Sequence, residues 1–308
     1  MEISTLLSKM LVFVVLMLIG YLFARRGLVG SEFIRTASNL VLNVFMVGTI
    51  LSSIISTGME RELSELGEIV LLAFLMTAVG YAAAWAVTRF VRVEPEYAGT
   101  YEILMGVGNS MFIALPVVSA IYGPYAVFIV SLTCIPFNIC LYSYGTWRIR
   151  GSAAGTFRIR DVFSIPLIAT LVGIGIILLH VPVPQTILEL LGTLSGATMP
   201  MSMIIIGASL GTVSLLDAFR NPKLAVLSTV KLVVIPVITW LVCRMLTDDP
   251  VLLMTLTITA AAPSAVIVSV IAIQCGKDAV FSSEAVQHST ICSVVTIPLL
   301  IQLLSGLS

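Results

Sequence analysis

Apolar stretches of about twenty residues recur along this chain from one end to the other, and they constrain its fold more than any other feature. A helix needs about 20 mostly apolar residues to cross a hydrocarbon core of ~30 Å. The sequence predicts an all-α integral membrane protein with ten transmembrane helices. The ten predicted spans are Leu6–Ala24, Ala37–Thr57, Glu68–Thr88, Tyr97–Tyr122, Tyr125–Trp147, Val162–Leu179, Ile187–Leu210, Leu224–Arg244, Val251–Cys275 and Ala285–Leu304.

The composition excludes several other classes of protein. Hydrophobic residues make up 58% of the 308 positions and charged residues only 10%, whereas a soluble domain carries about 45–50% and 25%. Sixteen basic and sixteen acidic residues cancel, so we expect the lipid bilayer, and no nucleic acid, as a partner. The basic pair Arg25 and Arg26 follows the first apolar run instead of preceding it, which indicates a retained span and not a signal peptide.

Basic residues in the connections predict the orientation. The connections after the odd-numbered spans carry twelve Lys and Arg residues, the opposite side carries Lys9, Arg61 and Arg244, and Lys231 lies within a span. Because cytoplasmic loops carry the basic excess, we predict a multi-pass protein of the plasma or inner cell membrane with both termini outside. The twelve are Arg25, Arg26, Arg35, Arg89, Arg92, Arg148, Arg150, Arg158, Arg160, Arg220, Lys223 and Lys277.

The two halves of the chain resemble each other. A shift of 153 residues places Leu18-Ile19-Gly20 on Leu171-Val172-Gly173, and the same shift aligns later landmarks. Each half holds five spans, an odd number, so the second half inserts inverted relative to the first. We therefore predict two inverted five-helix repeats, 1–147 and 162–308, joined by a cytoplasmic linker at 148–161. Such repeats are common in secondary transporters.

Spans four and nine are interrupted at matching places. Gly108, Asn109 and Ser110 disfavour helix in span four, and Pro263 with Ser264 breaks span nine. Ordinary kinks are the alternative, since Gly and Pro are frequent in membrane helices. The match across the repeat favours broken helices that cross. Half-helices beginning near Ser110 and Ser264 would direct positive dipole ends at the crossing, which suits a carboxylate.

Other polar residues within the spans allow two interpretations each. Asn43 either bridges helices or lines the site, and Asn138 is favoured as functional because Pro136 loosens the same turn. Lys231 either extends its side chain toward the membrane surface or holds a positive charge near the anion path. We expect His288 to be hydrated at the end of the last span.

No cofactor or metal is expected. The five cysteines form no CxxC pair and match no zinc or disulfide spacing. The sequence contains no phosphate loop, metal cluster or nucleophile motif, so we predict a protein that is not an enzyme and that depends on gradients or membrane potential.

At the residues just described, the chain resembles the auxin efflux carrier family, which includes plant auxin exporters and bacterial malate or malonate permease-like carriers. Gly108-Asn109-Ser110-Met111-Phe112-Ile113-Ala114-Leu115-Pro116 is similar to the family's crossover, and Lys231 through Pro236 to its basic residue followed by proline. The stretch from Pro200 to Leu210 resembles its seventh-span signature, and Ser289-Thr290 its last span. Val47 stands where the family commonly has proline.

The resemblance implies an architecture like that of bile-acid symporters and NhaA-like antiporters. Helices 1, 2, 6 and 7 would form a scaffold, and helices 3–5 and 8–10 a transport domain with crossed helices 4 and 9. It further implies elevator-like transport of small organic anions and a homodimer. The predicted substrate-binding residues are Asn109, Ser110, Pro116, Asn138, Pro263, Ser264, Asn43, Lys231 and Thr290.

Two alternatives remain open from the sequence. One keeps the architecture but makes the chain a sodium-coupled symporter of the bile-acid type, which the shortage of carboxylates near the breaks disfavours. The other is a membrane-embedded sensor or enzyme, for which the chain offers neither an output domain nor a reactive constellation.

Overall fold

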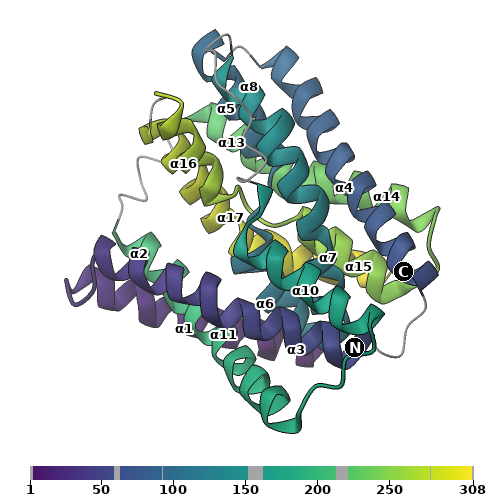
Figure 1. Ribbon diagram of the computed structural model, residues 1–308. Helices are drawn as coiled ribbons and strands as arrows, with labels where there is room; N and C mark the ends of the chain where they lie inside the picture. Colours follow the sequence, from purple (N-terminus) through teal and green to yellow (C-terminus); the bar gives the residue numbers. More distant parts are fainter. Residues whose placement is uncertain are drawn as a thin grey trace. The chain divides into compact units, whose positions relative to one another are not determined.

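The computed structural model is helical throughout the residues it describes, which are 3–58, 63–91, 93–151, 162–212, 221–277 and 279–306 (Figure 1). Most of the predicted linker 148–161, together with Arg61, Arg92 and Arg220, lies outside them. Seven of the described helices are long and apolar enough to cross a membrane. Three further apolar helices are shorter: Ser110–Tyr122, Ile165–Leu178 and Pro250–Ala260.

The chain divides into two compact units. Unit 1 comprises Met1–Ile69, Met111–Cys134 and Ser164–Val213, and unit 2 comprises Val70–Ser110, Ile135–Phe163 and Ser214–Ser308. Each unit therefore draws on both halves of the sequence.

Unit 1 is built around long helices that pack closely. Its main elements are α1 (Ile3–Arg25), α2 (Ser31–Leu40), η1 (Val41–Phe45), α3 (Met46–Gly58), α10 (Ile165–Leu178) and α11 (Gln185–Gly211). The green α11 runs alongside α1 and α3 (Figure 1), and α10 packs against α3. A Cβ atom at Gly207 of α11 would overlap the backbone carbonyl of Met17 on α1, so glycine is needed there for this close approach.

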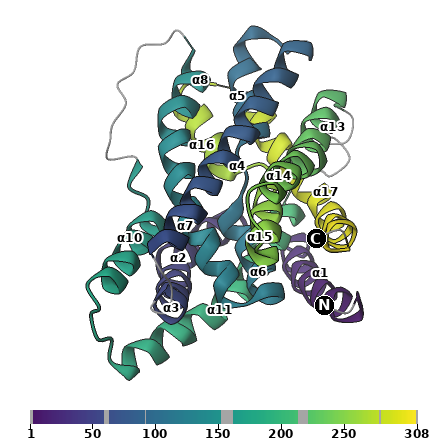
Figure 2. The same cartoon turned by 90° about the vertical axis from the view of Figure 1, so that its right-hand side faces the viewer.

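Unit 2 contains the shorter, interrupted helices. Its elements are most of α4 (Leu63–Phe90), α5 (Pro95–Gly106), the end of α7 (Pro124–Cys140), η3 (Leu141–Gly145), α8 (Thr146–Arg150), α13 (Pro222–Thr229), η4 (Val230–Val234), α14 (Ile235–Arg244), α15 (Pro250–Ala260), α16 (Val266–Gln274) and α17 (Ala279–Ser305). Helices α13 and α16 both pack against α17, and α14 packs against α15 (Figure 2).

Two prolines set wide turns in the chain. Pro116 is the second residue of α6 (Leu115–Tyr122) and follows the π-helix η2 (Ser110–Ala114). Pro236 is likewise the second residue of α14 and follows the π-helix η4. Because a proline ring clashes with the carbonyl four residues earlier, the preceding turn widens. Wide turns of this kind are frequent at functional sites, and η4 carries Lys231.

Candidate functional site

The two interrupted helices of unit 2 meet at their breaks. Helix α5 ends at Gly106 and α15 ends at Ala260, and an antiparallel bridge joins Gly108 to Ser264. The amide of Asn109 donates to the carbonyl of Pro263 at 2.6 Å, and the amide of Ala265 donates to that of Val107 at 3.2 Å. The breaks thus satisfy each other's backbone groups, which is the condition for irregular backbone inside an apolar layer. Both predicted interruptions are present, and we call their meeting point the crossover.

Ser264 ties three elements of unit 2 together. Its hydroxyl donates to the carbonyl of Leu104 in α5 at 2.7 Å, and its amide donates to the Oγ atom of Ser289 in α17 at 3.1 Å. The side chain is fully buried. The helix that follows the break, α16, begins at Val266 with Ala265 as its N-cap. Ser264 therefore fixes the geometry of the crossover, and the first amides of α16 come after it.

Lys231 places an amine directly at the crossover. Its side chain is only 2% exposed, and its Nζ atom donates to the carbonyl of Ala260, the last residue of α15, at 3.1 Å. A Cβ atom added to Gly108 would lie 3.0 Å from the same Nζ atom. The alternative in which Lys231 extends toward the membrane surface is wrong for this structure. The crossover therefore combines the ends of two helices with a buried amine.

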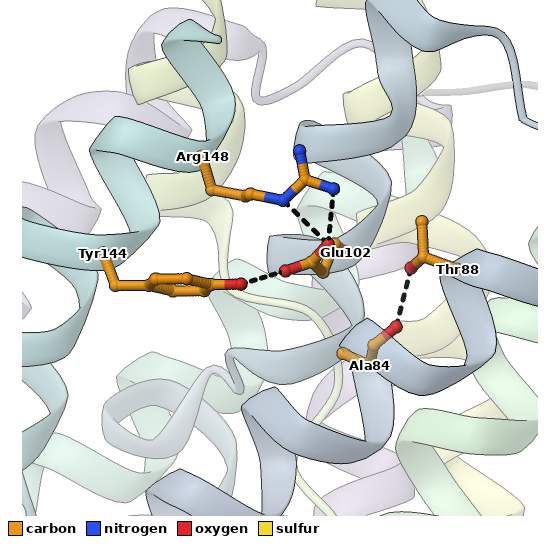
Figure 3. Close-up of polar contacts among 5 residues, drawn as sticks. All are labelled: Ala84, Thr88, Glu102, Tyr144 and Arg148. Atoms are coloured by element: carbon orange, nitrogen blue, oxygen red, sulfur yellow. Dashed lines mark hydrogen bonds and ion pairs between the residues drawn. The ribbon is translucent and has the colours of Figure 1, made fainter.

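A buried ion pair holds the middle of α5. Glu102 is completely buried, and its Oε2 atom accepts from Nη2 and Nε of Arg148 in α8 at 2.8 and 2.9 Å (Figure 3). The hydroxyl of Tyr144 donates to the other carboxylate oxygen at 2.5 Å. Figure 3 also shows the Thr88 hydroxyl bonding the Ala84 carbonyl within α4. Glu102, the acid nearest to the first break along the chain, is thus fully engaged.

The start of α5 is also anchored, outside the apolar spans. Lys223 contacts both carboxylate oxygens of Glu94 at 3.0 Å, and this hydrogen bonding lowers the pKa of Glu94. The hydroxyl of Tyr101 donates to the carbonyl of Lys223 at 2.8 Å. Helix α5 is therefore held at its start, at its middle by Glu102 and at its end by Ser264, which positions the break that follows it.

The structure gathers five of the nine predicted site residues around the crossover: Asn109, Ser110, Pro263, Ser264 and Lys231. Asn109 is half-buried, and Ser110, the first residue of η2, is buried. Asn138 is buried in α7. The hydroxyl of Thr290, which follows Ser289 in α17, donates to the carbonyl of Val286 in its own helix.

Two predicted site residues belong to unit 1, whereas the residues of the crossover belong to unit 2. Pro116 is buried in α6, where it follows the wide turn η2. Asn43 lies on η1 and is exposed instead of being packed between helices.

Sequence reasoning was wrong about His288 and missed two contributors. His288 is buried, not hydrated, and its Nδ1 atom lies 2.6 Å from the Oγ atom of Ser228. Ser289 accepts the Ser264 amide, but nothing in its neighbourhood in the sequence indicates that partner. The pairing of Glu102 with Arg148 was also missed, although a lone carboxylate within an apolar span always signals a partner elsewhere.

No obvious metal centre accompanies the crossover. Within the parts of the chain that the structure describes, no three His, Cys, Asp or Glu side chains are grouped so as to hold a metal ion. The polar groups at the crossover are backbone amides and carbonyls, serine hydroxyls and one lysine amine. This set suits the reversible binding of a small polar or anionic molecule.

Two comparisons with known proteins also indicate a membrane transport protein. A family model described as membrane transport protein matches residues 5–157 and 152–301. A protein of Methanothermobacter thermautotrophicus named as an uncharacterized transporter is 28% identical over 298 residues, which cover 92% of this chain and 94% of that protein. The apolar helices and this match define a multi-pass membrane transport protein. The chain belongs to the auxin efflux carrier family.

Proposed function

We propose that this protein is a secondary transporter of small organic anions, and that the crossover is its substrate site. The observation that carries the proposal is the position of the buried Lys231 amine at the meeting point of two interrupted helices. Broken helices near the middle of the membrane are how many secondary transporters build their central site.

The charges at the crossover favour an anion. The N-terminus of α16 brings about half a positive charge to this point, and its amides suit a carboxylate. In this proposal Lys231 is protonated and adds a positive charge beside the Ala260 carbonyl. Of the carboxylates that the structure describes close to the breaks, Glu102 is neutralised by Arg148. A carboxylic acid such as a dicarboxylate or an auxin-like aromatic acid is the substrate class that fits.

The division into two units suggests a mechanism for this transport, with Met111–Cys134 of the predicted spans four and five on the side of unit 1. We propose that unit 2 carries the substrate and that unit 1 serves as the scaffold in elevator-like alternating access. In this proposal the ten spans form two inverted repeats, with both termini outside a cell membrane. A homodimer would hold the scaffolds in place.

Substitution of Asn109 by alanine tests the site. The bridge to Pro263 uses the backbone amide of Asn109, so Asn109→Ala removes the side chain and leaves the bridge in place. We expect folded protein that has lost transport. Purified protein in liposomes would be tested for transient currents with malate and with indole-3-acetate, with and without sodium.

Asn39→Ala serves as the matched control, because Asn39 is an exposed asparagine of α2 in unit 1. Normal currents in the control and none in Asn109→Ala support the proposal. Wild-type currents that persist undiminished in Asn109→Ala contradict it. Currents that require sodium favour the sodium-coupled symporter instead.

A further inference from the structure

We propose that Lys231 is a tethered cation that occupies the place of a coupling ion at the crossover, so that transport needs no sodium. The claim that transport needs no sodium rests on the proposed function. The claim that the Lys231 amine replaces a bound cation concerns only unit 2 and is tested separately.

Two helices of unit 2 end at the crossover with their carbonyl groups. Helix α5 ends at Gly106 and α15 ends at Ala260. A helix C-terminus carries about half a negative charge, so two such ends bring roughly one negative charge to the break region. The start of α16 offsets about half of this charge. In an apolar layer a nearby cation stabilises the remainder, because water is not there to solvate it.

In transporters with discontinuous helices, half-helix C-termini and unwound carbonyls are the groups that hold a coupling sodium ion or proton. Here the Nζ atom of Lys231 donates to the carbonyl of Ala260, the terminal carbonyl of α15, at 3.1 Å. It also packs against Gly108, two residues after the end of α5. The lysine amine thus lies where such an ion would bind. Together with the start of α16 it outweighs the negative ends of α5 and α15, so the crossover keeps a net positive charge for an anionic substrate.

The surroundings of Lys231 support this role over that of an ordinary ion pair. The side chain is 2% exposed, and the described ion pairs of unit 2 join Arg148 to Glu102 and Lys223 to Glu94. Lys231 itself bonds to a backbone carbonyl. Glycine at position 108 preserves the space for the amine, since a Cβ atom there would lie 3.0 Å from it. Lys231 lies on the wide turn η4, which Pro236 follows.

The test compares two substitutions that remove the charge in different ways. Lys231→Ser leaves a small polar space beside the helix ends, whereas Lys231→Met fills the space with an apolar chain of similar length. The melting temperature of each purified protein is measured in sodium chloride and in choline chloride at equal ionic strength. Uptake of labelled malate and indole-3-acetate into liposomes is measured in the same two salts.

We expect the wild type to show the same melting temperature and the same uptake in both salts. Sodium should raise the melting temperature of Lys231→Ser by roughly 2–4 °C, because an ion that binds only the folded state stabilises it. Lys231→Met should show no sodium effect and should lose uptake by at least about tenfold, a change that corresponds to ~1.4 kcal/mol.

Three results overturn the inference: wild-type uptake or stability that rises with sodium, Lys231→Met with wild-type uptake, or folded Lys231→Ser that does not respond to sodium. If neither variant folds, the wild-type comparison in the two salts decides alone. A wild type that moves none of the acids tested counts against the proposed function, whereas the stability of Lys231→Ser in sodium still decides the role of Lys231.

Discussion

The two units bury different kinds of polar side chain. Among the described residues, every buried polar side chain of unit 1 is a serine or threonine, such as Thr49, whose hydroxyl lies 2.6 Å from that of Thr198. Unit 2 also buries Asn138, His288 and the charged Glu102 and Lys231. Hydroxyl groups are inexpensive to bury because they bond their own helix, whereas charges within a membrane are costly and mark functional sites.

The units also differ in how their helices continue. In unit 1, α11 runs unbroken for 27 residues even though it contains Pro200, and its glycines allow backbone contact with α1. In unit 2, α5 and α15 stop at the crossover after 12 and 11 residues. Unit 1 therefore derives its stability from close packing of long helices, whereas unit 2 gives up helix continuity to bring two backbone breaks together at a site.

The largest effect is expected from disturbing the packing of unit 1. Gly207→Ala adds a methyl group that would overlap the backbone carbonyl of Met17, and backbone cannot move aside as a flexible side chain can. We expect a loss above ~4 kcal/mol, the range of exceptionally damaging substitutions. Size-exclusion chromatography in detergent should show little or no folded protein.

Gly196→Ala is the matched control for this prediction, because Gly196 lies on the same helix and an added Cβ atom would meet nothing within 4 Å. It should elute like the wild type. Equal elution profiles for the two variants would show that the contact between α1 and α11 is not as close as described.

An intermediate loss of stability is expected when the buried ion pair of unit 2 is broken. Glu102→Gln leaves Arg148 without its charged partner, and breaking a buried pair costs ~3–5 kcal/mol. The Arg148 side chain is 29% exposed, so water compensates in part and we expect about 2 kcal/mol. Thermal unfolding of Glu102→Gln, Arg148→Met and the double variant measures the coupling. A double variant that is as destabilised as the sum of the two singles would show that the pair is not coupled.

The smallest loss of stability is expected when the pair of threonine hydroxyls in unit 1 is broken. Thr49→Val removes one partner of the Thr49–Thr198 contact and should cost ~1 kcal/mol. Replacing both threonines by valine should cost less than the sum of the two single substitutions, because both remove the same contact. Melting temperatures of the single and double variants check this order. A larger loss in Thr49→Val than in Glu102→Gln would contradict the ranking of this hydroxyl pair below the buried ion pair.

The positions of the apolar helices and of the two helix breaks could be predicted from the sequence. Runs of apolar residues located the helices, and Gly108 with Pro263 located both breaks, because glycine and proline act on the backbone at their own positions. The side-chain contacts between residues distant along the chain could not be predicted. Glu102 and Arg148 are 46 residues apart, and no local pattern selects arginine 148 from the basic residues near it.

The direction of Lys231 was equally hidden. The sequence does not show that the helix widens at Lys231, nor that Gly108 and the Ala260 carbonyl, both distant along the chain, receive its amine. His288 was misplaced for a related reason. The last helix begins at Ala279, six residues before the predicted start of the span, so His288 lies deeper in the helix and finds Ser228 as a partner.

The most direct test of the central claim is a density map of the protein in a lipid nanodisc, recorded with and without saturating indole-3-acetate or malate. The account predicts non-helical backbone at 107–109 and 261–265, with the Lys231 amine against the Ala260 carbonyl. It also predicts added density for the acid at the crossover, beside Asn109. Helices that run unbroken through both regions, or an acid bound far from Lys231, would contradict it.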